Sequence, residues 1–159
     1  MLFRSPRVWG PNVHDARVRV DPETGDVAIL DYVIAHDAGP PINPAVVEGQ
    51  LHGGLLHGLG YALFEALPYR EDGSLAGTTF LDYMLGTAPE MPIEPRLLHF
   101  ESATAQNAEG FRGAGEAGTI PAPAAVLSAI EAALASRGVK AWLDELPATP
   151  ERVMEAQGG

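Results

Sequence analysis

The chain has 159 residues, of which 46% are hydrophobic, and this is enough for one packed domain or a piece of a larger one. Its formal net charge of -11 argues against a nucleic-acid-binding surface and against docking on an anionic membrane, because both need clustered lysine and arginine. The absence of cysteine excludes disulfides, thiolate zinc sites, iron–sulfur ligation and a cysteine nucleophile. With no apolar run of spanning length and no signal segment, a soluble cytoplasmic protein is the default expectation.

The first part of the chain predicts a β-hairpin. Residues 1–15 show no clear period, and apolar and polar residues then alternate from Ala16 to Val20. Turn-forming residues at 21–26 separate this strand from a second apolar run over Val27–Ile34. Residues 36–44 hold three prolines and a glycine and are therefore expected to be irregular.

A glycine-rich helix is predicted from Pro44 to Ala66, with Asn43 as its N-cap. The segment contains five glycines, each of which costs about 1 kcal/mol in helix propensity. We expect close packing of the helix backbone against a neighbour to offset that cost. An apolar stripe at helical spacing marks the buried face: Val47, Leu51, Leu55, Leu59 and Ala62.

Shorter elements follow. The Asp72-Gly73 pair between residues 67–70 and 75–81 predicts a second hairpin. Residues 87–95 are expected to form a proline-punctuated loop, and residues 97–102 a short strand.

The last third of the chain predicts a second helix, which begins at Pro121 or Pro123 after a glycine-rich loop and has Gly138 as its C-cap. A final strand is predicted over Val139–Leu143, and a short terminal helix begins at residues 149–151. The buried face of the second helix is expected to carry Leu127, Ile130 and Leu134.

Two stretches carry candidate chemistry. Residues 110–118 place a single acid, Glu116, among four glycines and two alanines, and a carboxylate on such an open loop is suited to general-base catalysis. Residues 36–50 gather polar side chains at a helix N-terminus, which favours an anionic ligand. Taken alone, each stretch is better explained by an ordinary structure: a turn before a helix in the first case and a capped helix start in the second. His52 and His57 do not share a helix face, so no metal-binding side chains are predicted.

Taken in order, these stretches resemble the C-terminal part of the large, molybdenum-binding subunit of the xanthine dehydrogenase, aldehyde oxidase and carbon monoxide dehydrogenase family. The resemblance covers residues 16–155. It is carried by the pattern D-x-G-x-x-I-N-P-x-x-x-x-G-Q, which begins at Asp37, and by G-x-G-E-x-G about 60 residues later. It implies an α+β fold, the C-terminal portion of a molybdopterin-binding domain over residues 16–159. Residues 1–15 are poorly defined, and we hypothesise that Met1–Ser5, which does not fit the family, is not native.

The resemblance also implies a function, the oxidation of an aldehyde, a nitrogen heterocycle or a similar carbon centre using water, with Glu116 as the general base. The metal is expected to be held by the dithiolene of a pterin, in its cytosine dinucleotide form, and not by side chains. Iron–sulfur clusters and FAD are expected on partner domains or subunits. The residues implied to bind the cofactor are Asp37, Ile42, Asn43, Gln50, Arg112, Gly113, Ala114 and Gly115.

Because subunits of this family are several times longer, the chain is expected to be a fragment that is inactive alone and is completed by an N-terminal remainder. The alternative is a non-catalytic binding or interaction module that reuses the cofactor-facing surface. A carboxylate at Glu116, inside a loop of small residues, has no purpose in such a module and favours the enzyme segment.

Overall fold

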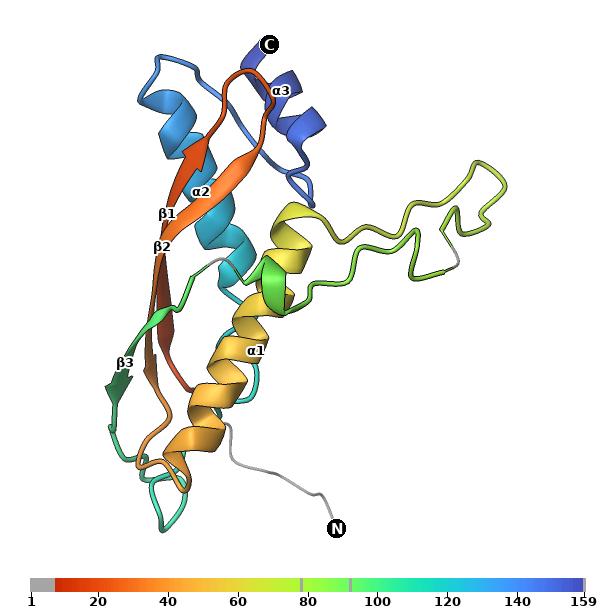
Figure 1. Cartoon of the computed structure of the whole chain (residues 1–159). Helices are drawn as coiled ribbons and strands as arrows, with labels where there is room; N and C mark the ends of the chain where they lie inside the picture. Colours follow the sequence, from red (N-terminus) through yellow and green to blue (C-terminus); the bar gives the residue numbers. More distant parts are fainter. Residues whose placement is uncertain (1–7, 78, 92, 159) are drawn as a thin grey trace.

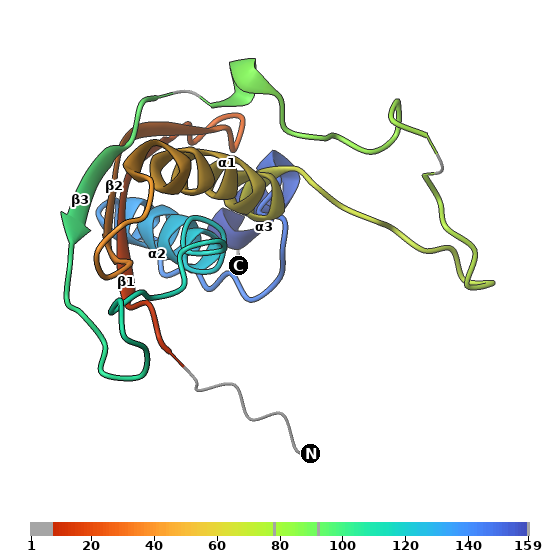
Figure 2. The same cartoon turned by 90° about the horizontal axis from the view of Figure 1, so that it is seen from below.

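The described chain forms a three-stranded sheet in the order β1-β2-β3, and its two longer helices both cover one face of that sheet (Figure 1, Figure 2). This computed structural model describes residues 8–77, 79–91 and 93–158, so the hypothesis about residues 1–5 lies outside the described residues. The α+β class is confirmed. The elements are β1 (Asn12–Val20), β2 (Val27–Asp37), α1 (Pro44–Leu63), the 3₁₀ helix η1 (Ala88–Glu90), β3 (Arg96–Phe100), α2 (Ala122–Ala135) and α3 (Pro150–Gly158).

The predicted β-hairpin is confirmed, and both of its strands are longer than expected. β1 begins at Asn12 rather than Ala16, and β2 continues beyond Ile34. The expectation that His36 belongs to an irregular segment is wrong, because this residue pairs with Asn12 of β1 and with His99 of β3. The prolines that suggested irregularity come later and interrupt the chain only after β2 has ended. β3 confirms the short strand predicted near residues 97–102 and runs parallel to β2.

A bulge in β2 keeps its apolar side chains on the core face. The register of the hairpin shifts between Arg17 and Val18, and Leu30 of β2 has no partner on β1. The extra residue reverses the alternation, so that Ile29 and Tyr32 are both buried although they are three positions apart.

The start of α1 is as predicted. The side chain of Asn43 accepts a hydrogen bond from the amide of Val46 at 3.3 Å. The helix ends at Leu63, three residues before the predicted end. Just after it, the amide of Glu65 donates a hydrogen bond to the carbonyl of Gly60 at 2.7 Å. The predicted stripe is buried at Leu51, Leu55, Leu59 and Ala62. Neither α1 nor any other helix among the described residues is long and apolar enough to cross a lipid bilayer.

The glycines of α1 serve two different surfaces. A Cβ placed on Gly58 would lie 2.5 Å from the Cβ of Ala122, and one on Gly54 would lie 3.0 Å from the Cα of Gly118. Close backbone packing therefore holds α1 against the start of α2 and the loop before it, as expected. Gly49 and Gly53, by contrast, have no heavy atom within 4 Å of an added Cβ, so they leave a bare strip on the helix.

The second predicted helix is confirmed as α2. Ile130 and Leu134 are fully buried, but Val126 rather than Leu127 completes the buried face. Gly138 has a φ of +82°, and its amide donates to the carbonyl of Ala135 at 2.9 Å. This left-handed residue ends the helix, in the role that glycine most often has after a helix.

Two predicted β elements are wrong. Residues 139–143 alternate as a strand does, and Val139 and Leu143 pack against the core, but none of the described strands pairs with them. The amide of Leu143 donates instead to the side chain of Glu131 at 2.7 Å. The second hairpin is reduced to one bridge between Tyr69 and Leu75, and the described residues of 75–81 form no regular strand. At residues 139–143 the alternation therefore reflects burial of one side of the segment and not pairing in a sheet.

The segment between α1 and η1 forms an arm, defined as residues 64–77 and 79–87, that projects from the body (Figure 1, Figure 2). The arm carries apolar side chains that are more than half exposed: Leu67, Tyr69, Phe80, Leu81, Met84 and Leu85.

Candidate functional site

The two chemically suggestive stretches meet beside the start of α1. A cavity of about 340 Å³ lies between the segment that enters α1 and residues 111–114. Sequence reasoning missed Phe111 and Val46 in its wall; Val46 lies one helical turn after Asn43, and this spacing could have identified it. The cavity brings together four of the predicted cofactor-binding residues: Ile42, Asn43, Arg112 and Ala114.

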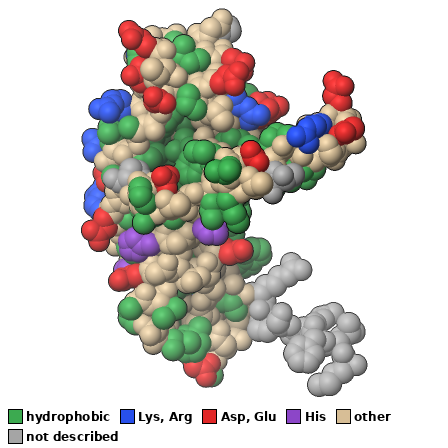
Figure 3. All heavy atoms as spheres, turned by 45° about the vertical axis from the view of Figure 1, so that its right-hand side comes forward, with side chains coloured by type: hydrophobic (Ala, Val, Ile, Leu, Met, Phe, Trp, Pro, Cys, Tyr) green, Lys and Arg blue, Asp and Glu red, His purple; other side chains and the backbone are tan. Residues whose placement is uncertain are grey.

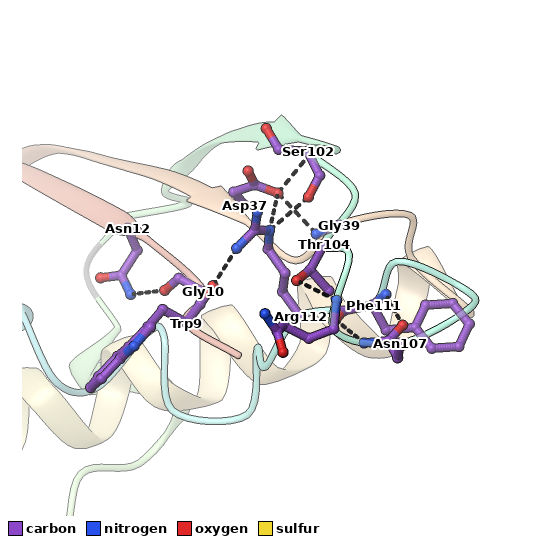
Figure 4. A network of polar contacts seen from close by, with 11 residues as sticks. Trp9, Gly10, Asn12, Asp37, Gly39, Ser102, Thr104, Asn107, Phe111 and Arg112 are labelled. Carbon is purple, nitrogen blue, oxygen red and sulfur yellow. Dashed lines mark hydrogen bonds and ion pairs between the residues drawn. The ribbon is translucent and has the colours of Figure 1, made fainter. Parts of the chain in front are cut away.

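Arg112 anchors the beginning of the glycine-rich loop (Figure 4). Its Nε donates to the carbonyl oxygen of Ser102 at 2.6 Å, and its Nη1 donates to that of Trp9 at 2.7 Å. Its backbone amide donates to the carbonyl of Ala38 at 2.8 Å. Through its side chain and its amide, this one residue joins the segment before β1, the end of β2 and the segment after β3.

Asp37 braces the same junction (Figure 4). Its Oδ1 accepts hydrogen bonds from the amides of Gly39 at 2.9 Å and Ser102 at 3.0 Å, and lies 3.8 Å from Nε of Arg112. Burial opposes ionisation, but these hydrogen bonds and the guanidinium of Arg112 outweigh it, so the pKa of Asp37 is lowered from its ordinary value. The charged carboxylate is therefore engaged with the protein itself, and its cofactor contact stays a prediction.

The end of the loop is clamped between α1 and β1. The hydroxyl of Thr119 donates to the carbonyl of Gly54 at 3.0 Å, and a Cβ on Gly118 would lie 2.4 Å from the carbonyl oxygen of Leu51. From the other side, Nε2 of His14 lies 2.9 Å from the carbonyl oxygen of Ala117. The residues just after Glu116 are thus held on two sides.

Residues 113–116 are open between these two anchors. Within the described parts of the chain, their four amides have no hydrogen-bond acceptor. A Cβ on Gly113 or Gly115 would meet no heavy atom within 4 Å. The side chain of Glu116 is exposed and makes no hydrogen bond or ion pair with the described residues. Consecutive free N–H groups on a small-residue loop are a ready site for an anionic group.

Gln50 and Glu116 lie outside the wall of the cavity. Gln50 is exposed on α1, next to the bare strip formed by Gly49 and Gly53. The donor set as a whole fits the pterin cofactor that the resemblance implies, because an apolar wall lies beside free backbone amides and the start of a helix. Among the described residues of that wall, Arg112 alone carries a charged side chain, and this side chain is already bound to the protein.

A second polar cluster ties α1 to the sheet. Nε2 of His36 lies 2.6 Å from Nδ1 of His99, and Nε2 of His99 lies 3.6 Å from Oε1 of Glu48. Nδ1 of His36 is buried and has no partner among the described residues. Burial and the neighbouring His99 lower the pKa of His36, while Asp37 opposes this effect only partly.

The protein is expected to lose stability as the pH falls below about 6.5. The pKa of His36 and, through burial, that of His14 are lowered in the folded state, so the unfolded chain binds these protons first. The contribution of these histidines to the free energy of unfolding is fully present above their ordinary pKa of 6.5. It is lost as the pH falls from there toward the lowered pKa values of the folded state. The lowered pKa of the Asp37 carboxyl changes the stability of the protein only below its ordinary value of 3.8, outside this pH range.

Thermal unfolding between about pH 7.5 and pH 5 measures this loss. His36→Gln should show a shallower dependence on pH than the unchanged chain. A midpoint that is constant, or that rises, across this interval contradicts the prediction.

Comparison with known proteins identifies the family. Residues 5–92 match the model of the molybdopterin cofactor-binding domain, and the chain belongs to that family. The resemblance to the molybdenum-binding large subunits is thereby confirmed.

Individual relatives agree with this assignment. The chain is 44% identical over 148 residues to the nicotine 6-hydroxylase large subunit of Paenarthrobacter nicotinovorans, covering 92% of this chain and 18% of that protein. It is 40% identical over 137 residues to the 6-hydroxypseudooxynicotine dehydrogenase complex subunit gamma of the same organism, covering 86% and 17%. The crystal structure of quinoline 2-oxidoreductase from Pseudomonas putida 86 matches with a TM-score of 0.85 at 35% identity, covering 91% of this chain and 18% of that one. The chain therefore spans less than a fifth of the length of these relatives.

Proposed function

We propose that the chain is part of the large subunit of a molybdenum hydroxylase and that Glu116 is its general base. The homologues are molybdenum-cofactor oxidoreductases of the xanthine dehydrogenase family. The observation that carries the proposal is the open loop at residues 113–116, whose unpaired amides and exposed carboxylate are held between two anchored ends.

The site residues have separate roles in cofactor binding, loop positioning and proton transfer. The amides of residues 113–115 donate to anionic groups of the bound pterin, and Ile42, Asn43 and Ala114 line the space for its dinucleotide. Gln50 contacts the pterin from the bare strip of α1, and Asp37 and Arg112 keep both loops in register. When bound, the cofactor supplies the oxygen transfer and accepts the electrons of substrate oxidation. Glu116 takes the proton of the reacting water at its carboxylate.

The substrate is a nitrogen heterocycle. This choice among the family's substrates is supported by the relatives named for nicotine and quinoline, both of which are nitrogen heteroaromatic compounds. The cofactor is the cytosine dinucleotide form, held along the cavity at the start of α1.

The chain alone has no activity, because its loops form one side of the cofactor site. The N-terminal remainder of the subunit provides the other side and covers the apolar arm, which stands clear of the body in Figure 3. Iron–sulfur and FAD subunits or domains then carry the electrons away, in the cytoplasm. Phe80 and Leu81 at the arm are 83% and 95% exposed, which is costly unless a partner covers them.

The experiment is to purify the complete large subunit with its electron-transfer partners and to measure molybdenum, released nucleotide and hydroxylation of pyridine or quinoline substrates. We expect molybdenum and cytidine monophosphate in equal amounts, and hydroxylation only in the complete assembly. Ile42→Asp should lower the content of both, because it sets a charge against the dinucleotide phosphates, whereas Val13→Asp on the outer sheet face should not. A complete subunit without molybdenum, or with another nucleotide, contradicts the corresponding part of the proposal.

A further inference from the structure

A three-residue hydrogen-bond chain runs from β2 to the residue that follows Glu116. The hydroxyl of Tyr32 lies 2.9 Å from Nδ1 of His14, and Nε2 of His14 lies 2.9 Å from the carbonyl oxygen of Ala117. The two rings meet edge-on, with centroids 5.5 Å apart. Tyr32 is completely buried, and neither His14 nor Tyr32 was singled out from the sequence.

The direction of this chain follows from its ends. A carbonyl oxygen only accepts hydrogen bonds, so the proton of neutral His14 must be on Nε2. Nδ1 is then an acceptor and needs a donor. Burial raises the pKa of Tyr32, so its hydroxyl keeps its proton and can donate. All three groups are therefore satisfied in one arrangement: Tyr32 to His14 to Ala117.

We propose that His14 is a positioning residue for Glu116, with Tyr32 supporting its tautomer by donating to Nδ1; this inference rests on the proposed role of Glu116. The peptide group that begins at the Ala117 carbonyl is held by β1 through His14. Its other end, Gly118, is held by α1, because a Cβ there would lie 2.4 Å from the carbonyl oxygen of Leu51. The backbone directly after Glu116 is thus fixed from opposite sides, while the four amides before it stay free.

Protonation of His14 opposes this arrangement. A second N–H would point at the Tyr32 hydroxyl, which would lose its acceptor. Around His14, β1 provides the charged group Asp15 and β2 provides Tyr32. The α2 residues that line the adjoining groove are uncharged: Ala124, Ala125, Ser128, Ala129 and Ala132. Burial lowers the pKa of His14, so the neutral form dominates near neutral pH.

The direct test is NMR of the ¹⁵N-labelled 159-residue chain, together with amide hydrogen exchange. At neutral pH we expect a proton on Nε2 of His14 and none on Nδ1. His14→Leu should speed exchange of the hydrogen-bonded amides of Ala117, Thr119 and Ile120 about tenfold, the effect of one lost hydrogen bond. His14→Gln, which can still donate, should restore protection to within about threefold. His57→Leu, at an exposed histidine of α1, is the matched control and should leave these residues unchanged.

The pH dependence of this amide protection distinguishes a positioning role of His14 from a purely structural one. In the unchanged chain, protection of the Ala117, Thr119 and Ile120 amides, corrected for intrinsic exchange, should fall as the pH drops below about 6.5. His14→Gln should show no such fall. In the complete large subunit, His14→Leu should lower kcat and leave KM unchanged, because substrate binding does not depend on the Ala117 carbonyl.

A proton on Nδ1 of His14 at neutral pH overturns the proposal, and so does unchanged exchange of the Ala117, Thr119 and Ile120 amides in a folded His14→Leu chain. If His14→Leu does not fold, the tautomer of the unchanged chain and the exchange of Tyr32→Phe decide. Tyr32→Phe should keep the proton on Nε2, because the Ala117 carbonyl still needs a donor, but should lose part of the loop protection. Full activity of Glu116→Gln would defeat the proposed function, whereas the tautomer and exchange results would still stand.

Discussion

Replacement of Glu116 by glutamine is expected to lower turnover of the complete enzyme by about 10²–10⁴-fold, while the cofactor stays bound. This loss corresponds to roughly 3–5 kcal/mol of barrier, the contribution typical of one positioned base. Glutamine keeps the size and polarity of the side chain but cannot accept a proton at neutral pH. Because the carboxylate makes no hydrogen bond or ion pair with the described residues, the fold should not change.

Glu109→Gln is the matched control, since Glu109 is an exposed acid on the same segment and lies before the anchor at Arg112. Its turnover should stay within about twofold of the unchanged enzyme. Molybdenum and nucleotide content, measured for both variants, separates loss of chemistry from loss of cofactor. Turnover retained in Glu116→Gln with full cofactor would remove Glu116 from the mechanism.

The second large effect is expected for Gly58→Ala, which should destabilise the fold by roughly 1–3 kcal/mol or more. The added methyl group would lie 2.5 Å from the Cβ of Ala122 and 3.0 Å from the carbonyl oxygen of Thr119. Both atoms belong to or are bonded directly to the backbone, so no side-chain rotation can relieve the overlap. α1 and α2 would have to separate, which would also loosen the residues that follow Glu116.

Gly53→Ala is the control for helix propensity. Gly53 is in the same helix, and an added Cβ there meets no heavy atom within 4 Å. The exchange should therefore stabilise the chain by about 1 kcal/mol. Chemical denaturation of the 159-residue chain measures both free energies of unfolding. Equal effects of the two substitutions would show that the close contact between α1 and Ala122 is not what these glycines serve.

Sequence pattern was informative wherever a signal is local. Alternation located the hairpin, the Asn43-Pro44 pair located the start of α1, and Gly138 marked the end of α2. Each of these depends on the conformational preference of one or a few neighbouring residues. Alternation was misleading at residues 139–143, where one side packs on the core without any partner strand.

The candidate site divides in the same way. The motifs identified the two loops, and the structure places Ile42, Asn43, Arg112 and Ala114 around one cavity. What sequence could not show is how those loops are held. The contacts of Arg112 with the Trp9 and Ser102 carbonyls join residues 103 and 10 positions apart, and no periodicity encodes such a contact.

The sequence by itself determined the family, the order of the main elements and the presence of an acid on an open glycine-rich loop. Only the tertiary structure decided the bulge at Leu30, the parallel pairing of β3 and the chain from Tyr32 through His14 to Ala117. The physical reason is the range of the interactions. Turn, cap and amphipathic preferences act over a few residues, whereas a buried hydroxyl or imidazole is satisfied by whichever group the folded chain brings beside it.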